Sequence, residues 1–187
     1  MPAPSTDPAD AGRLVEPERF RHAFRQVPSP VAVVLTRVVA GHVRGITCTS
    51  ATALSGTPPM ALVSVGERTG IGQMAQADGW FSINFLAADR IALARAFATG
   101  GLALADTPVR VGFGRTGTPV LTSGTVSVLE CGVASAHRGG DHWVLHGLVH
   151  HARFQAEITP LCYARGRYGS FVPEEGSAGQ PGSARSG

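Results

Sequence analysis

One uncharged run of small and hydroxyl residues lies between two apolar segments: Gly45-Ile46-Thr47-Cys48-Thr49-Ser50-Ala51-Thr52-Ala53-Leu54-Ser55. The first apolar segment begins at Val43, and the second, Met60 to Val65, follows the double proline Pro58-Pro59. Closely spaced hydroxyls and accessible backbone N–H groups suit a planar polar ring or a phosphate. The same composition is typical of an ordinary polar strand and turn, so the run alone leaves both interpretations open.

The segments around this run alternate between apolar stretches and turn residues, as strands joined by turns do. In residues 80–86, Phe81 and Ile83 fall on one face, and Ser82 and Asn84 fall on the other. We expect strands at residues 31–36, 42–49, 60–65, 80–86, 119–121, 125–135, 143–154 and 161–163.

Apolar residues at helical spacing predict a few helices. The first begins at Pro17 and has one apolar stripe, formed by Phe20, Ala23, Phe24 and Val27. A short helix is expected at residues 71–77, and another runs from an Asp89 N-cap to Ala98. Many strands with few helices indicate a mostly β barrel rather than alternating βαβ units.

The chain has 187 residues, which is enough for one domain with a sizeable core. We expect that domain at residues 13–172, with disordered tails at 1–12 and 173–187, where Pro, Ser, Gly and acidic residues dominate. We find no apolar run long enough to cross a membrane and no secretory signal. The three cysteines are widely spaced, which is typical of a reducing compartment. A cytoplasmic protein without a membrane partner is therefore expected.

The formal net charge is +3, and every basic side chain other than histidine is arginine, since the chain has no lysine. The arginines are scattered rather than clustered, and aromatic residues make up only 6% of the chain. This pattern argues against a nucleic-acid partner. Any phosphate site must therefore use arginine, hydroxyl or backbone N–H groups.

Three histidines recur at a spacing of four: His142, His146 and His150. On a helix they would share one face and could hold a metal, but on a strand they would be too far apart. Trp143 and the preceding glycine pair favour a strand, so no metal site is expected. His142 differs because it follows Asp141 at a strand end, where a carboxylate can fix its tautomer.

The usual motifs of hydrolysis and of nucleotide binding are missing from the sequence. There is no Gly-x-Ser-x-Gly elbow, no Walker motif and no Gly-x-Gly-x-x-Gly between a strand and a helix. Cys48 and Cys131 fall inside expected strands, where cysteine usually acts as a small hydrophobic residue. The residues alone indicate a β domain with a polar groove for a small ligand.

Five segments in order resemble the short-chain flavin reductase family, the reductase components of two-component flavin monooxygenases. They are residues 20–24 with 31–34, the run from Gly45 to Pro59, residues 81–86 with Phe97-Ala98, Gly140-Asp141-His142, and Pro160-Leu161 with Gly166-Arg167-Tyr168-Gly169. The resemblance implies an FMN-binding split β-barrel of Greek-key type with a few flanking helices. It also implies a homodimer that binds FMN or FAD at its interface.

The implied reaction is hydride transfer from NADH or NADPH to flavin N5, with reduced flavin passing to a partner monooxygenase, by diffusion. Site residues carried over from the resemblance fall into three groups. The ring and ribityl chain would meet Thr47, Cys48, Thr49, Ser50 and Ala51, and Ala53 would face the phosphate region. Arg68 and Thr69 would bind the phosphate, and Asn84 would lie near the ribityl or pyrophosphate part. His142 would contact the nicotinamide nucleotide, and Tyr168 would close that pocket.

Some positions depart from the family pattern. The family often has Asn, an aromatic residue and Ser where this chain has Thr49, Ala51 and Ala53, and Gly where it has Pro30. A missing aromatic side chain would loosen flavin binding, and it leaves the choice between FMN and FAD open. The choice between NADH and NADPH is also open. Alternatives to the reductase are a split-barrel oxidase with tightly held FMN, a non-catalytic flavin- or haem-binding barrel, and a basic nucleic-acid-binding barrel.

Overall fold

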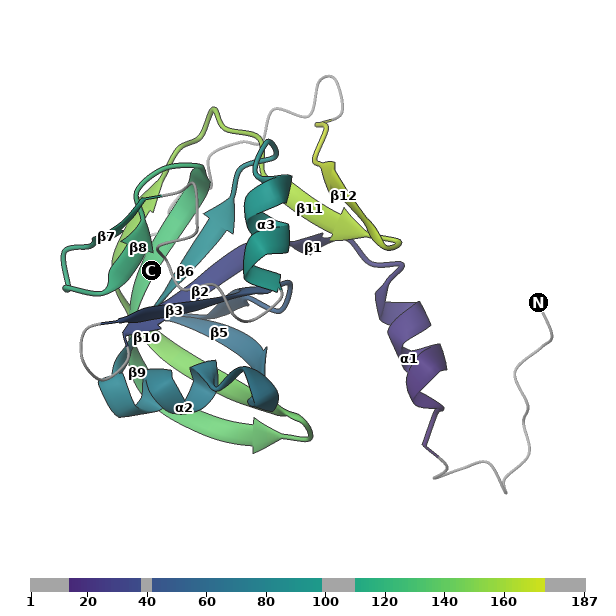
Figure 1. The fold of residues 1–187 in the computed structure, drawn as a ribbon, viewed down its shortest axis with the longest axis horizontal. Helices are drawn as coiled ribbons and strands as arrows, with labels where there is room; N and C mark the ends of the chain where they lie inside the picture. Colours follow the sequence, from purple (N-terminus) through teal and green to yellow (C-terminus); the bar gives the residue numbers. More distant parts are fainter. Residues whose placement is uncertain (1–13, 38–41, 99–109, 174–187) are drawn as a thin grey trace, which may run out of the picture.

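A curled antiparallel sheet forms the body of the protein, as a computed structural model describes it for residues 14–37, 42–98 and 110–173 (Figure 1). Seven strands pair in the order β3-β2-β6-β9-β10-β5-β4. The sheet closes on itself, because β3 also contacts β5. The expected mostly β barrel is therefore confirmed. The expected tails at 1–12 and 173–187 lie outside the described residues, except for Pro173.

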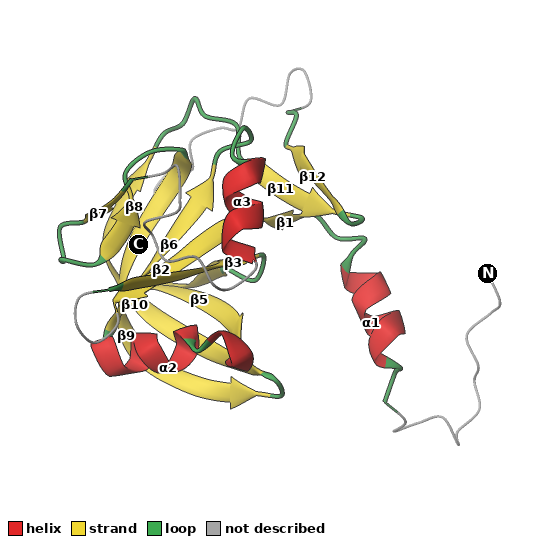
Figure 2. Cartoon of the chain, viewed as in Figure 1, coloured by secondary structure: helices red, strands yellow, loops and turns green. Residues whose placement is uncertain are grey.

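The elements follow one another as shown in Figure 2. The barrel strands are β2 (Ala32–Arg37), β3 (Val43–Cys48), β4 (Thr52–Gly56), β5 (Pro59–Gly66), β6 (Trp80–Leu86), β9 (Thr125–Gly139) and β10 (His142–Phe154). A small sheet joins β1 (Ser29–Pro30), β11 (Leu161–Ala164) and β12 (Arg167–Ser170), and a hairpin joins β7 (Val111–Phe113) and β8 (Pro119–Leu121). The helices are α1 (Pro17–Phe24), the 3₁₀ turn η3 (Glu67–Thr69), α2 (Ile71–Asp78) and α3 (Ile91–Ala98).

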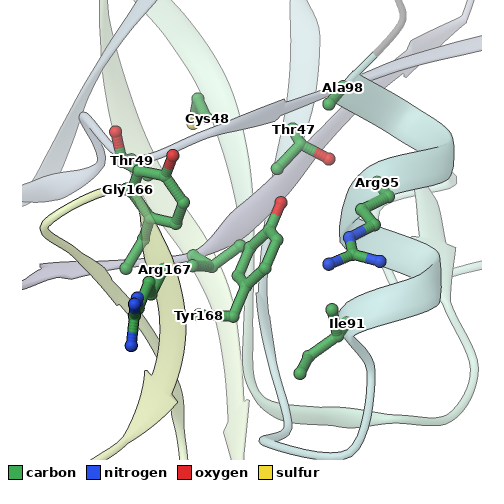
Figure 3. A pocket seen from close by; sticks show the side chains of 11 residues that line it. Thr47, Cys48, Thr49, Ile91, Arg95, Ala98, Gly166, Arg167 and Tyr168 are labelled. Atoms are coloured by element: carbon green, nitrogen blue, oxygen red, sulfur yellow. The ribbon is translucent and has the colours of Figure 1, made fainter.

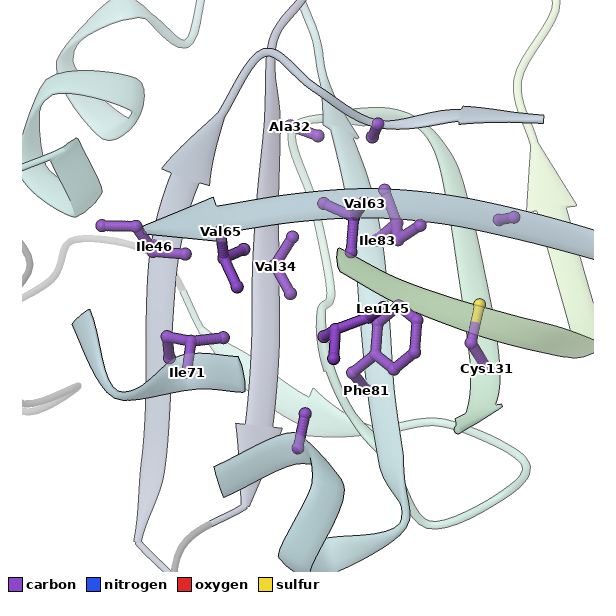
Figure 4. Close-up of a cluster of buried hydrophobic side chains, with 13 residues drawn as sticks. Ala32, Val34, Ile46, Val63, Val65, Ile71, Phe81, Ile83, Cys131 and Leu145 are labelled. Carbon is purple, nitrogen blue, oxygen red and sulfur yellow. The ribbon is translucent and has the colours of Figure 1, made fainter. Parts of the chain in front are cut away.

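Strand β2 is buried on both faces, which explains its unbroken apolar sequence. Ala32 and Val34 face the barrel interior, where they pack with residues such as Phe81 and Leu145 (Figure 4). Its alternate residues, such as Val33, belong to a second cluster formed with α3, β8 and β11. Fully burying a Val, Leu or Phe side chain stabilises the fold by about 1.5–3 kcal/mol. The two clusters thus hold the barrel and its outer elements together.

Helix α3 lies close against β3 because Gly45 has no side chain. A Cβ atom there would come within 2.5 Å of Leu35 and 2.7 Å of Phe97, closer than real contacts allow. The Thr47 hydroxyl donates a hydrogen bond of 2.7 Å to the carbonyl of Ala94. This pair of contacts fixes where the exposed face of α3 stands relative to β3.

Helix α1 projects away from the barrel, as Figure 1 shows, and none of its residues is buried. It begins at Pro17 as predicted but ends at Phe24, before the last residue of the expected stripe, and no described residue covers that stripe. Phe20, Phe24 and the following Val27 are 51%, 64% and 56% exposed. None of the helices in the described ranges is long and apolar enough to span a membrane.

Besides the two-residue β1, three strands lie where the sequence indicated loops or irregular chain. Strand β4 pairs along β5 inside the hydroxyl-rich run, β7 pairs with β8, and β12 completes a hairpin with β11. Each of these strands is short and gains its hydrogen bonds from a partner. Pairing of this kind depends on tertiary context more than on local composition.

Candidate functional site

A cavity of about 620 Å³ lies between β3, α3 and the β11–β12 hairpin (Figure 3). Three consecutive residues of the hydroxyl-rich run, Thr47, Cys48 and Thr49, form one wall. The remaining lining comes from the second cluster, from α3 and from the hairpin: Val31, Ile91, Arg95, Ala98, Tyr163, Gly166, Arg167 and Tyr168. Among the described residues, this lining includes two arginines and no carboxylate.

The Cys48 thiol in this wall is neutral at ordinary pH. Burial raises the pKa of Cys48, although hydrogen bonds from Ser50 oppose that shift. A neutral thiol is a poor nucleophile. Cys48 therefore contributes shape and a soft contact surface rather than covalent chemistry.

Two tyrosines and an arginine form the opposite wall of the cavity. The rings of Tyr163 and Tyr168 meet edge to face, with centroids 5.1 Å apart. The Arg95 guanidinium lies 5.8 Å from the centroid of the Tyr168 ring. Burial and the neighbouring Tyr163 raise the pKa of Tyr168, against the opposing charge of Arg95, so its hydroxyl stays protonated.

A second cavity, of about 350 Å³, lies on the other side of Thr49. Ser50 and Tyr163 also line it, and the rest of its lining comes from α1 and the chain after it: Phe20, Arg21, Phe24, Arg25, Val27 and Ser29. Thr49 and Tyr163 separate the two cavities, since both residues line each of them.

Arg68, Thr69 and His142 gather at a different place, the turn after β5. Gly66 pairs with His142 across the sheet, and the Glu67 N–H donates a 2.9 Å hydrogen bond to the Asp141 carbonyl. None of the three predicted site residues lines either of the two cavities. His142 and Tyr168, which were expected to bound one nicotinamide pocket, therefore do not both line either of these two cavities.

The side chains at this turn have distinct partners. The Thr69 hydroxyl donates to the Gly66 carbonyl at 2.7 Å and accepts from the Ile71 N–H at 3.3 Å. His142 Nδ1 lies 2.7 Å from an Asp141 carboxylate oxygen. That hydrogen bond, with the charges of His142 and Arg68, holds the pKa of Asp141 below its ordinary value. Arg68 is exposed, so its guanidinium faces solvent.

Ser50 connects this turn to the cavity region. Its hydroxyl donates a hydrogen bond of 2.5 Å to the carbonyl of Ser64, two residues before the end of β5. The hydroxyl-rich run therefore reaches from the large cavity, at Thr47, to the strand that leads to Arg68. A ligand lying along this run could contact both regions.

The structure corrects the role expected for Asn84. Its side chain has no exposed surface, and its amide group donates to the Val33 carbonyl and the Ser82 hydroxyl at 3.0 and 2.8 Å. Its oxygen accepts from the Leu121 N–H at 2.9 Å. With these bonds made and no surface left, Asn84 cannot contact a ribityl or pyrophosphate group, so that expectation was wrong.

The two alanines of the run that were expected to contact the flavin differ in exposure. Ala51 is only 4% exposed and packs in the barrel interior, so only its backbone could contact a ring. Ala53 is exposed on β4, and it lines neither cavity.

The histidines of β10 lie on a strand, as predicted. His146 is 3.0 Å from the Ser135 hydroxyl, and the His150 ring packs on Trp80 with centroids 4.9 Å apart. Among the described residues, no group of three or more His, Cys, Asp or Glu side chains could hold a metal ion.

Arg95, Arg167 and Tyr163 line the large cavity, and none of them was among the expected site residues. Arg95 stands alone among the apolar residues of α3, and Arg167 lies beside Tyr168 in a recognised segment. Those were the available signals. The close approach of α3 to the hairpin places these side chains around one cavity, and local sequence patterns do not reveal that approach.

The donor set of this region fits a flavin and a nicotinamide nucleotide. Hydroxyls, backbone groups and aromatic faces suit planar rings, and arginines suit phosphates. Catalytic carboxylates are not needed where the bound groups carry the redox chemistry.

Comparison with known proteins gives the same result. A 4-nitrophenol monooxygenase reductase component of Rhodococcus opacus is 35% identical over 154 residues, covering 80% of each chain. An NADH-dependent FAD reductase of Streptomyces globisporus is 32% identical and covers 92% of each. The solved NADH:FAD oxidoreductase of Streptomyces globisporus, in complex with NAD and FAD fragments, superposes with a TM-score of 0.78 at 30% identity, covering 88% of this chain and 99% of that one. Residues 24–171 match the flavin reductase like domain, and the chain therefore belongs to the flavin reductase-like family.

Proposed function

We propose that this protein is an NAD(P)H-dependent flavin reductase that supplies reduced FMN or FAD to a separate monooxygenase. The observation that carries this proposal is the uncharged wall Thr47–Thr49, which faces arginines and tyrosines across a cavity whose described lining has no carboxylate. Family membership and the names of its relatives agree with it. The reaction needs no acid, base or nucleophile from the protein, because hydride passes directly from nicotinamide C4 to flavin N5.

The protein would hold the nicotinamide and flavin rings in contact and prevent other relative orientations of the two. Backbone groups from Thr47 to Ser50, together with the Thr49 hydroxyl, would hold the flavin ring. Arg68 would pair with its phosphate, with backbone N–H groups of the η3 turn beside it. The hydroxyl of Thr69 already bonds within that turn, so Thr69 shapes the turn more than it binds.

His142 would contact the nicotinamide nucleotide. A tautomer of His142 that donates Nδ1–H to Asp141 would present Nε2 as an acceptor for an amide N–H. Its side chain is 45% exposed, so this nitrogen can be reached from solvent. Asp141 would then act as a positioning residue that fixes the tautomer of His142.

The reductase would work as a homodimer. Support comes from α1, an eight-residue helix with no buried residue, because helices of this length are marginal in isolation. A second copy covering Phe20 and Phe24 would give α1 the packing that one chain lacks. It would also close the smaller cavity beside Thr49 and Ser50.

Reduced flavin would leave by diffusion. Thr49 and Ser50 are exposed, and Ala51 faces the barrel interior. The run contains no aromatic side chain that could enclose a ring. A weakly enclosed ring suits a substrate that must be released after each turnover.

The test is an NADH oxidation assay on the purified full chain, with and without added FMN or FAD. We expect steady oxidation that saturates with added flavin. Turnover with oxygen that needs no added flavin would instead support an oxidase with resident FMN. Flavin binding without NADH oxidation would leave a non-catalytic barrel, and the proposed function would be abandoned.

A further inference from the structure

We propose that Arg95, Arg167 and the Tyr163–Tyr168 pair form a subsite for the adenosine diphosphate half of a dinucleotide substrate. This assignment rests on the proposed function, since both NADH and FAD carry that group. It gives Tyr168 a different role from the nicotinamide contact expected from its sequence position.

The charge of the cavity supports this assignment. Arg95 and Arg167 both line it, both are exposed, and neither forms an ion pair with a described residue. None of the lining residues that the structure describes carries a carboxylate to neutralise them. Guanidinium groups bind phosphate oxygens in pairs of parallel hydrogen bonds, so two of them at one cavity suit a diphosphate.

The aromatic wall supplies the second half of the recognition. Tyr163 and Tyr168 meet edge to face, so their rings present faces in different directions, and Arg95 lies near the ring of Tyr168. Purine bases stack on tyrosine faces and on guanidinium planes. An adenine lying beside Tyr168 would place its diphosphate within reach of the arginines.

The position of Arg95 is fixed by packing. The carbonyl of its neighbour Ala94 accepts the hydrogen bond from Thr47. Phe97, two residues after Arg95, packs against Gly45, which has no side chain. Helix α3 is thereby held against the same strand that carries Thr47 to the cavity. Arg95 is thus presented to the cavity by the rigid part of the fold.

The competing role for Arg95 is that of a cation near the C-terminal end of α3, where a positive charge stabilises a helix. That role predicts a change in thermal stability and none in nucleotide affinity. Thermal stability and nucleotide affinity, measured on the same variant, therefore distinguish the two roles.

The experiment measures ADP binding to the full-length protein by calorimetry, without NADH or turnover. We expect Arg95→Ala to weaken ADP binding about ten-fold, the loss of one charge-assisted contact. Arg44→Ala removes an equal charge from an exposed position of β3 that does not line the cavity, and it should leave ADP affinity unchanged. Tyr168→Ala should weaken adenosine as well as ADP.

Unchanged ADP affinity in Arg95→Ala, or no ADP binding by the wild type, would overturn the assignment. Kinetic arms identify the source of the group. If NADH supplies it, the variant loses its preference for NADH over reduced nicotinamide mononucleotide, and if FAD supplies it, it loses its preference for FAD over FMN. An equal loss for FMN and FAD would mean that Arg95 binds the flavin phosphate, which also contradicts the assignment. Because ADP binding needs no turnover, it remains interpretable even if NADH oxidation fails.

Discussion

The hydroxyl of Thr47 donates a 2.7 Å hydrogen bond to the carbonyl of Ala94, joining the wall of the cavity to the helix across from it. We expect Thr47→Val to lower the free energy of unfolding by about 1 kcal/mol, since it removes the donor without changing the shape. Thr47→Ser keeps the hydroxyl and should stay close to the wild type. Urea unfolding measures both. A weaker flavin affinity at unchanged stability would mean that the hydroxyl serves the ligand instead.

Arg68→Ala should weaken flavin binding by about 1–3 kcal/mol, because an exposed guanidinium at the η3 turn would pair with the flavin phosphate. Quenching of flavin fluorescence on titration gives the dissociation constant. Arg44→Ala is again the charge-matched control. Equal affinity in wild type and Arg68→Ala would remove Arg68 from the phosphate site.

His142→Ala should raise the KM for NADH or lower kcat while flavin affinity stays nearly the same. Asp141→Asn should move the kinetics in the same direction by a smaller amount, because the imidazole remains but its tautomer is no longer held. Steady-state kinetics at saturating flavin measure both variants. If both match the wild type, His142 has no part in the site.

Glu130 gives the protein a predictable pH dependence. Burial alone would raise the pKa of Glu130, but hydrogen bonds from Thr116 and Arg115 and the charge of His151 give a net lowering from 4.5. A lowered folded-state pKa adds stability above the unfolded value, and that stability is lost as pH falls through the folded-state pKa.

Glu130→Gln should therefore lower the free energy of unfolding at neutral pH by about 1–3 kcal/mol, since it weakens three hydrogen bonds to a buried carboxylate. The difference from wild type should shrink below pH 4.5. Denaturant unfolding at several pH values measures it. A difference that stays constant with pH would show that the charge of Glu130 is not the cause.

Phe24→Asp should convert the proposed homodimer into monomers, because it puts a charge into the uncovered apolar stripe of α1. Sedimentation velocity measures the change. Phe113→Ser, which alters an equally exposed aromatic on β7, is the control and should leave the assembly intact. A wild-type protein that sediments as a monomer would contradict the homodimer.

The fold could be predicted largely from local patterns. The unbroken apolar run of β2 and the alternation of β6 reflect burial that acts on every residue of a strand, and the structure confirms both ranges within a residue or so. Strands β4, β7 and β12 were missed because their pairing partners, rather than their own composition, make them strands.

The site could be predicted only in part. The resemblance pointed to the hydroxyl-rich run, and Thr47, Cys48 and Thr49 do line a cavity. Arg95 could not be found, because its place in the cavity depends on how closely α3 approaches β3 at Gly45. Asn84 was misassigned because polar residues inside a strand pattern can serve the interior as well as a ligand.

The hydrogen bonds of Asn84 bear on how the barrel folds. In the native register Asn84 lies opposite Val33, and through Ser82 and Leu121 its bonds reach β8. A slip of β6 by one residue would turn this amide into the apolar interior, where it would have no partner and would cost several hydrogen bonds. One polar side chain thus penalises the nearest misfolded alternative and helps the chain to settle into a single strand register.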